Sequence, residues 1–328
     1  MEWHTHFGTV FFRTWRSAGL PDHEHFLSPY YLMLEERNKN IEWIDNSTGI
    51  DHSRLYDVYG FGVTVGKLFG AMFGLTAEQI NHTSDWCGRF NLGISLFDYI
   101  SDELDAVNSV SSLTVFQPFT KAENSVAYPS TSSEELVSNL AASVLQDVAN
   151  LSSSKSHLFK AMQEMFDAEY FISTTKLSAN ADLKKIYQAL YLKSAGPFQA
   201  MADYTASIKT ADDSILLHNA RAVGNALGMC YWLIDDAKDV WDDLEAGQWN
   251  IFLQLAAEKD SLIFASQADS ETITRLLHCW EQSQDAAKIS DEIITLLTDA
   301  ITKLELEEDV RNHTLGIIAA SLWQWYHS

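Results

Sequence analysis

Five aspartates close a long apolar run at residues 224–250, and this stretch constrains the fold more than any other part of the chain. It reads GNALGMCYWLIDDAKDVWDDLEAGQWN. An apolar run of this length that ends in acids predicts a helix packed into a core. At about 100° per residue, Asp235, Asp239 and Asp242 share one face of that helix. Gly228, further back on the same stripe with Gly224, predicts open space beneath the carboxylates.

Carboxylates crowded on one helix face repel one another, because like charges four residues apart cost about 0.2–0.5 kcal/mol per pair. A bound cation offsets this cost. Ligands that offer only oxygen suit a hard ion such as Mg²⁺. The alternative interpretation is a solvated acidic helix end, but the apolar run that leads into the acids favours a place in the core.

A second acid cluster reads DYISDELD and begins at Asp98. Asp98 and Asp102 are spaced i, i+4 on a helix predicted from about Ser84 to Leu104, so both carboxylates project from one face. Asn91 lies two turns back on the same face. If this helix faces the first one, the two clusters form a carboxylate mouth over an apolar pocket.

The net charge of −23, from 45 acidic and 22 basic residues, argues against nucleic acid or an anionic membrane as a partner. The three cysteines are widely spaced, which predicts reduced thiols and a cytoplasmic protein. The N-terminus shows no signal peptide, and no apolar run reaches the length of a membrane span.

Helical periodicity and scarce strand signals predict an all-α fold of roughly ten helices in a single domain over residues 1–328. Residues 1–50 are predicted to be irregular, because Pro21 and Pro29 interrupt them. Residues 108–133 are predicted to form a long loop. Gly196-Pro197 is predicted to kink a helix. The other predicted helices span about 51–74, 134–151, 155–176, 181–205, 250–266, 270–303 and 305–326.

An acidic protein binds an anion through metal ions and a few cations. Lys193, just before the predicted kink, is a candidate cation for the site, and Arg54 is another. Several Mg²⁺ ions in the carboxylate mouth would hold a polyanion, most naturally a diphosphate, and would stabilise the charge that develops as it departs. Aromatic faces stabilise a carbocation left behind.

These residues resemble the class I isoprenoid synthases, the all-α superfamily of trans-prenyl-diphosphate synthases and terpene cyclases. Residues 235–239, DDAKD, are similar to that superfamily's second Asp-rich motif. Asp98-Tyr-Ile-Ser-Asp102 is similar to a shortened first motif. Lys193-Ser194-Ala195 is similar to the Lys-Thr-Ala element that lies between the two motifs. The resemblance covers roughly residues 51–255.

The resemblance implies a helical bundle around a central apolar cavity, about three Mg²⁺ ions and a prenyl diphosphate substrate. It also implies a role in isoprenoid biosynthesis. Dimers are common in the superfamily, so the resemblance also allows a homodimer. The implied catalytic residues are Asp98, Asp102, Asp235 and Lys193. The implied metal ligands are Asp98, Asp102, Asp235, Asp236 and Asp239. The implied substrate-binding residues are Lys193, Arg54, Asn91, Gln248 and Gly228.

The departures from the superfamily pattern bear on the reaction. Chain-elongating synthases carry an arginine pair after the first motif, where this chain reads AVNSVSS, and a lysine where it has Gln248. Arg54 is the one base near the place of the N-terminal Gly-Lys element. We therefore expect a terpene synthase, a lyase that ionises one linear prenyl diphosphate of fifteen or more carbons and cyclises or quenches the cation.

The sequence is also compatible with two other functions. A prenyltransferase would elongate a chain, condense two chains head to head or prenylate another acceptor. An inactive homologue would serve as a binding subunit. The sequence determines neither the substrate's length nor the product.

Overall fold

The fold is built from helices, as the sequence predicts. The computed structural model describes residues 3–35, 52–103, 132–151, 155–209, 213–265, 269–282 and 284–327. Most of the predicted loop 108–133 lies outside the described residues, although its last two residues belong to α5. Within the described ranges, β-type pairing is limited to one isolated bridge between Lys176 and Gln248. None of the described helices combines the length and apolarity needed to cross a lipid bilayer.

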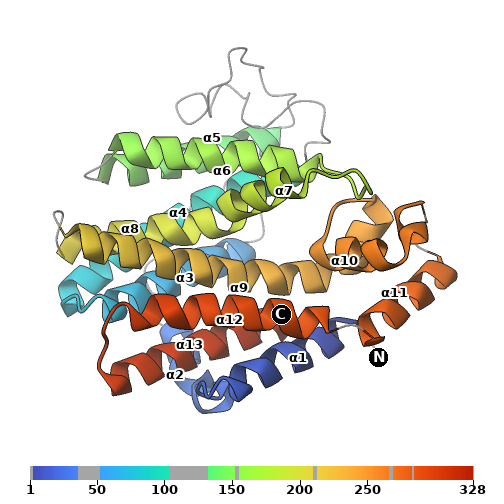
Figure 1. The fold of residues 1–328 in the computed structure, drawn as a ribbon. Helices are drawn as coiled ribbons and strands as arrows, with labels where there is room; N and C mark the ends of the chain where they lie inside the picture. Colours follow the sequence, from blue (N-terminus) through green and yellow to red (C-terminus); the bar gives the residue numbers. More distant parts are fainter. Residues whose placement is uncertain are drawn as a thin grey trace.

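The helices follow one another with short connections wherever the chain is described (Figure 1). Their bounds are α1 Trp3–Ser17, η1 His23–His25, α2 Leu27–Glu35, α3 His52–Met72, α4 Ala77–Glu103, α5 Ser132–Leu151, α6 Lys155–Ser173, α7 Leu183–Leu190, η6 Tyr191–Ala195, α8 Gly196–Lys209, α9 Ser214–Ala246, α10 Ile251–Lys259, η7 Ser261–Ala265, α11 Ser270–Gln282, α12 Asp285–Thr302 and α13 Glu308–His327.

The long helix α9 is the centre of the bundle. Helix α8 packs along one side of α9, and α12 packs along another (Figure 1). Helices α3 and α4 form the most extensively packed pair, and α5 and α6 cover the side of the bundle opposite α12, α13 and α1. The middle of α9 is therefore buried between other helices.

Local chemistry explains both ends of α9. The Asp213 carboxylate accepts hydrogen bonds from the backbone N–H groups of Ile215 and Leu216, which satisfies two donors of the first turn. Gly247 ends the helix with φ of 62°, a left-handed conformation that glycine adopts without strain. Both bounds agree with the capping signals in the sequence, which offers Asp212 or Asp213 as the N-cap and Gly247 as the residue that ends the helix.

The space left by the missing side chains of Gly224 and Gly228 is filled by neighbouring backbone, which corrects the prediction of open space at these two positions. A Cβ added to Gly224 would lie 2.6 Å from the Phe198 carbonyl oxygen, and one added to Gly228 would lie 2.6 Å from Ala195 Cα. The glycines instead let α9 approach the backbone of η6 and α8. This close approach brings Lys193 and Ser194 next to α9.

We expect Gly224→Ala to destabilise the fold by about 1–3 kcal/mol, because the added methyl group overlaps backbone atoms that cannot move aside. Thermal and urea unfolding would measure this loss. Glu245→Ala, an exposed change on the same helix, is the control and should unfold like the wild type. Equal stability of Gly224→Ala and wild type would contradict the close packing of α8 on α9.

The prediction that residues 1–50 are irregular is wrong for the described part, because α1, η1 and α2 lie there. Phe7, Phe11 and Trp15 recur every four residues and are fully buried, so α1 presents an apolar stripe to the core. Pro29 lies in the first turn of α2, where a proline costs no hydrogen bond. Proline therefore interrupts this segment less than expected.

Three other boundaries differ from the predictions. Helix α4 begins at Ala77 rather than near Ser84, because Thr76 and Gln79 form a reciprocal capping box. The helix predicted over 270–303 is two helices, α11 and α12. Likewise, the 250–266 segment divides into α10 and η7, and α13 begins at Glu308.

A π turn interrupts the helix at the predicted kink, directly before Gly196-Pro197. Pro197 has no N–H to offer the carbonyl group of Lys193, its i−4 partner. The preceding residues form one π-helical turn, η6, and the N–H of Gly196 bonds the carbonyl group of Tyr191, five residues back. Such π turns inside α-helices frequently occur at functional sites. This one carries Lys193.

Candidate active site

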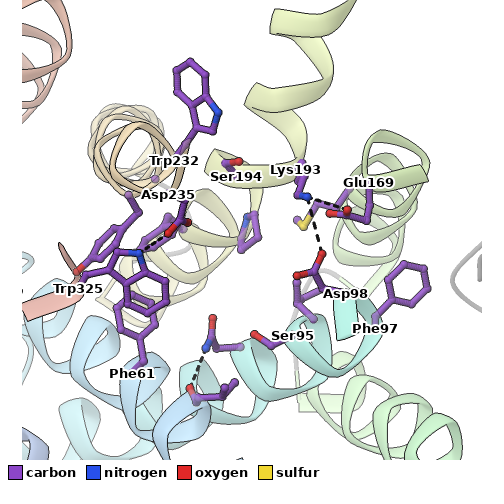
Figure 2. A pocket seen from close by; sticks show the side chains of 18 of the residues that line it. Phe61, Ser95, Phe97, Asp98, Glu169, Lys193, Ser194, Trp232, Asp235 and Trp325 are labelled. Carbon is purple, nitrogen blue, oxygen red and sulfur yellow. Dashed lines mark hydrogen bonds and ion pairs between the residues drawn. The ribbon is translucent and has the colours of Figure 1, made fainter. Parts of the chain in front are cut away.

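A cavity of about 320 Å³ lies where α3, α4, α6, η6, α8, α9 and α13 meet. Asp98 lies on one side of it and Asp235 on the other (Figure 2). Seven further residues that line the cavity bear on the site: Asn91, Ser95, Glu169, Lys193, Ser194, Gly228 and Trp325. The structure therefore brings one aspartate from each acid cluster and the predicted lysine to one apolar cavity.

Lys193 points between two carboxylates (Figure 2). Its Nζ donates a hydrogen bond to Glu169 Oε1 at 2.8 Å and lies 3.9 Å from Asp98 Oδ1. The π turn places this ammonium group beside the cavity, although the residues on either side of it are largely apolar. The lysine thus joins α6, the π turn and α4 at the mouth of the site.

Glu169 is a site residue that the sequence analysis missed. Its side chain is only 7% exposed. Burial raises the pKa of its carboxyl group to about 8; the Lys193 ammonium opposes this rise, and Asp98 adds to it. Met162, Met165 and Phe166 place Glu169 on the buried stripe of α6 at positions i, i+3, i+4 and i+7. An acid on an apolar stripe was the signal that could have identified it.

Trp325 is a second missed residue, and it comes from the last turns of α13. Its indole N–H donates a hydrogen bond to Asp235 Oδ1 at 2.5 Å (Figure 2). Lys238 Nζ donates to the Trp325 carbonyl oxygen at 3.1 Å and lies 5.7 Å from the centre of its ring. The C-terminal helix therefore fixes the orientation of the Asp235 carboxylate, which no local pattern in the sequence could indicate.

Burial raises the pKa of Asp235 to about 7; the hydrogen bond from Trp325 opposes this rise, and Asp239 adds to it. The folded protein therefore binds more protons at this site than the unfolded chain does between about pH 4 and pH 7. Stability contributed by the protonated carboxyl group is present below this window and is lost as the pH rises through it.

We therefore expect Asp235→Asn to melt at a higher temperature than the wild type at pH 8 without added metal, because the amide removes a poorly solvated charge and still accepts the Trp325 hydrogen bond. The advantage should shrink as the pH is lowered toward 5. Thermal melts of both proteins across this range, in buffers with a chelator, measure the difference. A constant difference at all pH values would contradict the shifted pKa.

The five aspartates of α9 differ in what they contact, and two of them bind the start of the next helix. The Asp236 carboxylate accepts a hydrogen bond from the Ile251 N–H, and that of Asp243 accepts one from the Asn250 side chain. Both hold the N-terminus of α10, and burial raises the pKa of both carboxyl groups, that of Asp243 to about 6. The structure thus places the Asp236 carboxylate, a predicted metal ligand, at a helix cap. Asp239 and Asp242 are exposed.

The oxygen donors on the two sides of the cavity fit a divalent cation. Asp98 Oδ1 is buried, and its ion pair with Lys193 Nζ at 3.9 Å is too long to be a hydrogen bond. A buried carboxylate oxygen without a hydrogen bond can be satisfied by an ion. Asp98 on α4 and Asp235 and Asp239 on α9 would hold Mg²⁺, whose ligands are oxygens. No cluster of three such groups is already assembled in the described ranges.

The remaining predicted site residues have different positions. Asn91 and Gly228 line the cavity, and the Asn91 amide donates to the Val58 carbonyl oxygen at 2.8 Å. Gln248 lies outside the lining, where its N–H bonds the Asp243 carbonyl oxygen at 2.8 Å. Arg54 and Asp102 belong to α3 and α4, but their side chains lie outside what the structure describes. Their roles stay predictions.

Aromatic rings form much of the cavity wall below the polar mouth. Phe198 stacks on Tyr231 with ring centres 5.1 Å apart, and Phe61 meets Tyr231 edge to face at 5.1 Å. The Trp325 ring lies 5.3 Å from Phe61. Aromatic faces attract a cation, so this wall suits an apolar chain that carries positive charge.

No family model matches the chain, and no curated protein matches it. Solved structures do. A geranylgeranyl pyrophosphate synthase from Lactobacillus brevis is 14% identical, with a TM-score of 0.58 over 94% of this chain and 98% of that one. The apo form of an Arabidopsis medium/long-chain length prenyl pyrophosphate synthase is 15% identical, with a TM-score of 0.62 over 92% and 98%.

A third similar structure is a polyprenyl synthase from Caulobacter crescentus complexed with calcium and isoprenyl diphosphate. It is 14% identical, with a TM-score of 0.52 over 95% of this chain and 97% of that one. At such low identity these likenesses show the fold. The chain has the all-helical fold of the class I isoprenoid synthases, as the sequence motifs indicated.

Proposed function

We propose that this chain, with its class I isoprenoid synthase fold, is an enzyme of isoprenoid biosynthesis that binds and ionises a prenyl diphosphate with the help of Mg²⁺. One observation carries this proposal: Asp98, Lys193 and Asp235 come from three separate elements and converge on one cavity with an aromatic wall. Carboxylates and an ammonium group at the mouth suit a metal-bound diphosphate, and the wall below suits its chain.

Each residue has a distinct task in this proposal. Asp98 and Asp235 hold Mg²⁺ from opposite sides, and Mg²⁺ neutralises the charge on the departing diphosphate. Lys193 binds a diphosphate oxygen directly. Glu169 holds the Lys193 ammonium in place, and Trp325 holds the Asp235 carboxylate. The rings of Phe61 and Tyr231 enclose the chain and exclude water from the cation.

Prenyl transfer is the first candidate for the step that follows ionisation. The similar structures are prenyl diphosphate synthases, and the Caulobacter crescentus protein binds isoprenyl diphosphate in the presence of a divalent ion. The sequence alone favoured the terpene synthase reaction over prenyl transfer, and these similar structures reverse that preference. Residues 104–131, where the sequence lacks the expected arginine pair, lie outside the described residues, so the binding place of a second substrate stays open.

Internal capture of the cation, the terpene synthase reaction, is the second candidate. Among the described residues that line the cavity, Lys193 is the one lysine or arginine. The same lining contains four acidic residues: Asp57, Asp98, Glu169 and Asp235. A single base beside four acids favours a site for one diphosphate rather than two. Such a site would suit a lyase.

Product analysis separates the two candidates. The purified protein is incubated with Mg²⁺ and geranyl, farnesyl or geranylgeranyl diphosphate, each with and without isopentenyl diphosphate. A longer diphosphate that forms only with isopentenyl diphosphate would establish prenyl transfer. A hydrocarbon or alcohol from one substrate alone would establish a terpene synthase. No product and no Mg²⁺-dependent binding of any of these diphosphates would overturn the proposal and favour a partner protein without activity.

A further inference from the structure

The indole N–H group of Trp232 is a buried hydrogen-bond donor beside the active-site cavity. Trp232 is 5% exposed and lines this cavity from α9 (Figure 2). Its Nε1 is buried and makes no hydrogen bond with any residue that the structure describes. An indole nitrogen can only donate, and a buried donor without an acceptor costs stability. The protein therefore keeps a donor here whose acceptor has to come from outside the described residues, and the proposed function assigns it no role.

Trp232 belongs to the stripe of α9 that lines the cavity. Gly228, Trp232 and Asp235 all line it, and their spacing of i, i+4 and i+7 places them on one side of the helix. Gly228 packs against the backbone of η6. Trp232 lies one turn, about 6 Å, further along α9 toward the acids. Trp232 is therefore one helical turn from Asp235 and one helical turn from the place where α9 meets η6, which carries Lys193.

Two buried polar atoms of the cavity lining lack a hydrogen bond within the described ranges: Trp232 Nε1 and Asp98 Oδ1. They differ in kind, because the nitrogen is a donor and the carboxylate oxygen is an acceptor. A lone cation would satisfy only the oxygen, and a lone anion only the nitrogen. An anion that carries a metal ion satisfies both. The Lys193 ammonium, the one basic group among the described residues that line the cavity, is already shared with Glu169 at 2.8 Å, so a neutral donor supplements it.

We propose that the Trp232 indole N–H donates a hydrogen bond to an oxygen of the bound diphosphate, on the α9 side of the cavity. This inference rests on the proposed function. Hydrogen bonds to an ionised oxygen are among the strong ones in proteins, so one neutral donor contributes measurably to binding. The nitrogen is shielded from solvent, and the χ2 torsion of tryptophan is broad, so a small turn of the ring accompanies binding.

The nuclear magnetic resonance signal of the indole group reports this bond without any need for turnover. The full-length protein is labelled with ¹⁵N at its ten tryptophans, and the indole signal that is missing from Trp232→Phe is assigned to Trp232. We expect this signal to move downfield on addition of Mg²⁺ with inorganic diphosphate, and with the unreactive thiolo-diphosphate analogues of geranyl, farnesyl or geranylgeranyl diphosphate. A buried water molecule is the other candidate acceptor, and it would leave the signal unmoved when a diphosphate binds.

Trp249 provides a matched control. It is also 5% exposed, and its Nε1 likewise makes no hydrogen bond with a described residue, but it does not line the cavity. In calorimetric titrations, Trp232→Phe should weaken Mg²⁺-dependent binding of the analogues by about tenfold, as expected for a hydrogen bond to a charged oxygen. Trp249→Phe loses the same atoms and should bind like the wild type.

A second change at Trp232 keeps the shape of the ring. Replacement of Trp232 by 3-benzothienylalanine puts a sulfur atom in the place of the N–H group and leaves the two fused rings intact. It should weaken binding as much as Trp232→Phe, because both remove the donor. Thermal melts confirm that each variant is folded.

The outcomes distinguish this inference from the proposed function. Mg²⁺-dependent binding of the analogues with an unmoved Trp232 signal would overturn the role of Trp232 alone. Equal weakening in folded Trp249→Phe, or wild-type affinity of the benzothienyl variant, would also overturn it. No binding of diphosphate or of any analogue to the wild type would overturn the proposed function and, with it, this inference.

Discussion

Asp98→Asn and Asp235→Asn should each lower turnover of the prenyl diphosphate by about a thousandfold or more, while the protein stays folded. The two carboxylates face the cavity from α4 and α9, and each amide removes the charge that would hold Mg²⁺ at the departing diphosphate. Product formation at saturating Mg²⁺ measures the loss. Removing one charge from an acid cluster relieves repulsion, so the thermal melt should show no loss of stability.

The control for these variants is Asp167→Asn, which removes an exposed carboxylate from α6 outside the active-site cavity. It should keep wild-type turnover. Addition of Mg²⁺ and inorganic diphosphate should raise the melting temperature of the wild type and of Asp167→Asn, but much less that of the two cavity variants. Wild-type rates in both Asp98→Asn and Asp235→Asn would refute the assignment of the metal ligands.

Lys193→Met should raise the KM for the prenyl diphosphate by about ten- to a hundredfold, because the cavity loses the ammonium group that binds a diphosphate oxygen. Above about pH 8 it should also destabilise the fold, since the charged Glu169 is then buried beside Asp98 without the cation that stabilises its charge. Steady-state kinetics and thermal melts measure the two effects separately.

A double variant separates the two roles of the lysine. Lys193→Met combined with Glu169→Gln removes the buried charge together with its partner, so stability should return toward the wild-type value while the KM stays high. Lys185→Met, a change at an exposed lysine on α7, should alter neither quantity. If the double variant also regained the wild-type KM, Lys193 would have a structural role only.

Periodicity, capping residues and the position of proline determined much of this fold. Asp213 and Gly247 bound α9 at the positions the sequence indicates, because capping depends on neighbouring backbone groups alone. The π turn before Pro197 follows equally from local chemistry, since proline removes one backbone donor. The prediction was wrong at α1, although the apolar stripe of Phe7, Phe11 and Trp15 is a local signal that indicates a helix.

The sequence also identified the helices whose acids converge, since charge repulsion on one face is a local property. Only the tertiary structure decided what each acid contacts. Asp235 and Asp236 are neighbours in the chain, yet one faces the cavity and the other caps α10, because the positions of α13 and α10 around α9 depend on the packing of the whole bundle. The role of Gly228 in close helix packing likewise depends on the tertiary structure, because it is set by the backbone that packs against α9.

Glu169 and Trp325 show the same limit. Each contacts its partner across a long separation in the chain: Glu169 lies 24 residues from Lys193, and Trp325 lies 90 residues from Asp235. Hydrogen bonds at such separations form only when burial brings two helices together, so no spacing rule predicts them. The sequence by itself determined which helices carry the acid clusters, because that depends on local spacing. Packing decided which of their carboxylates face the cavity.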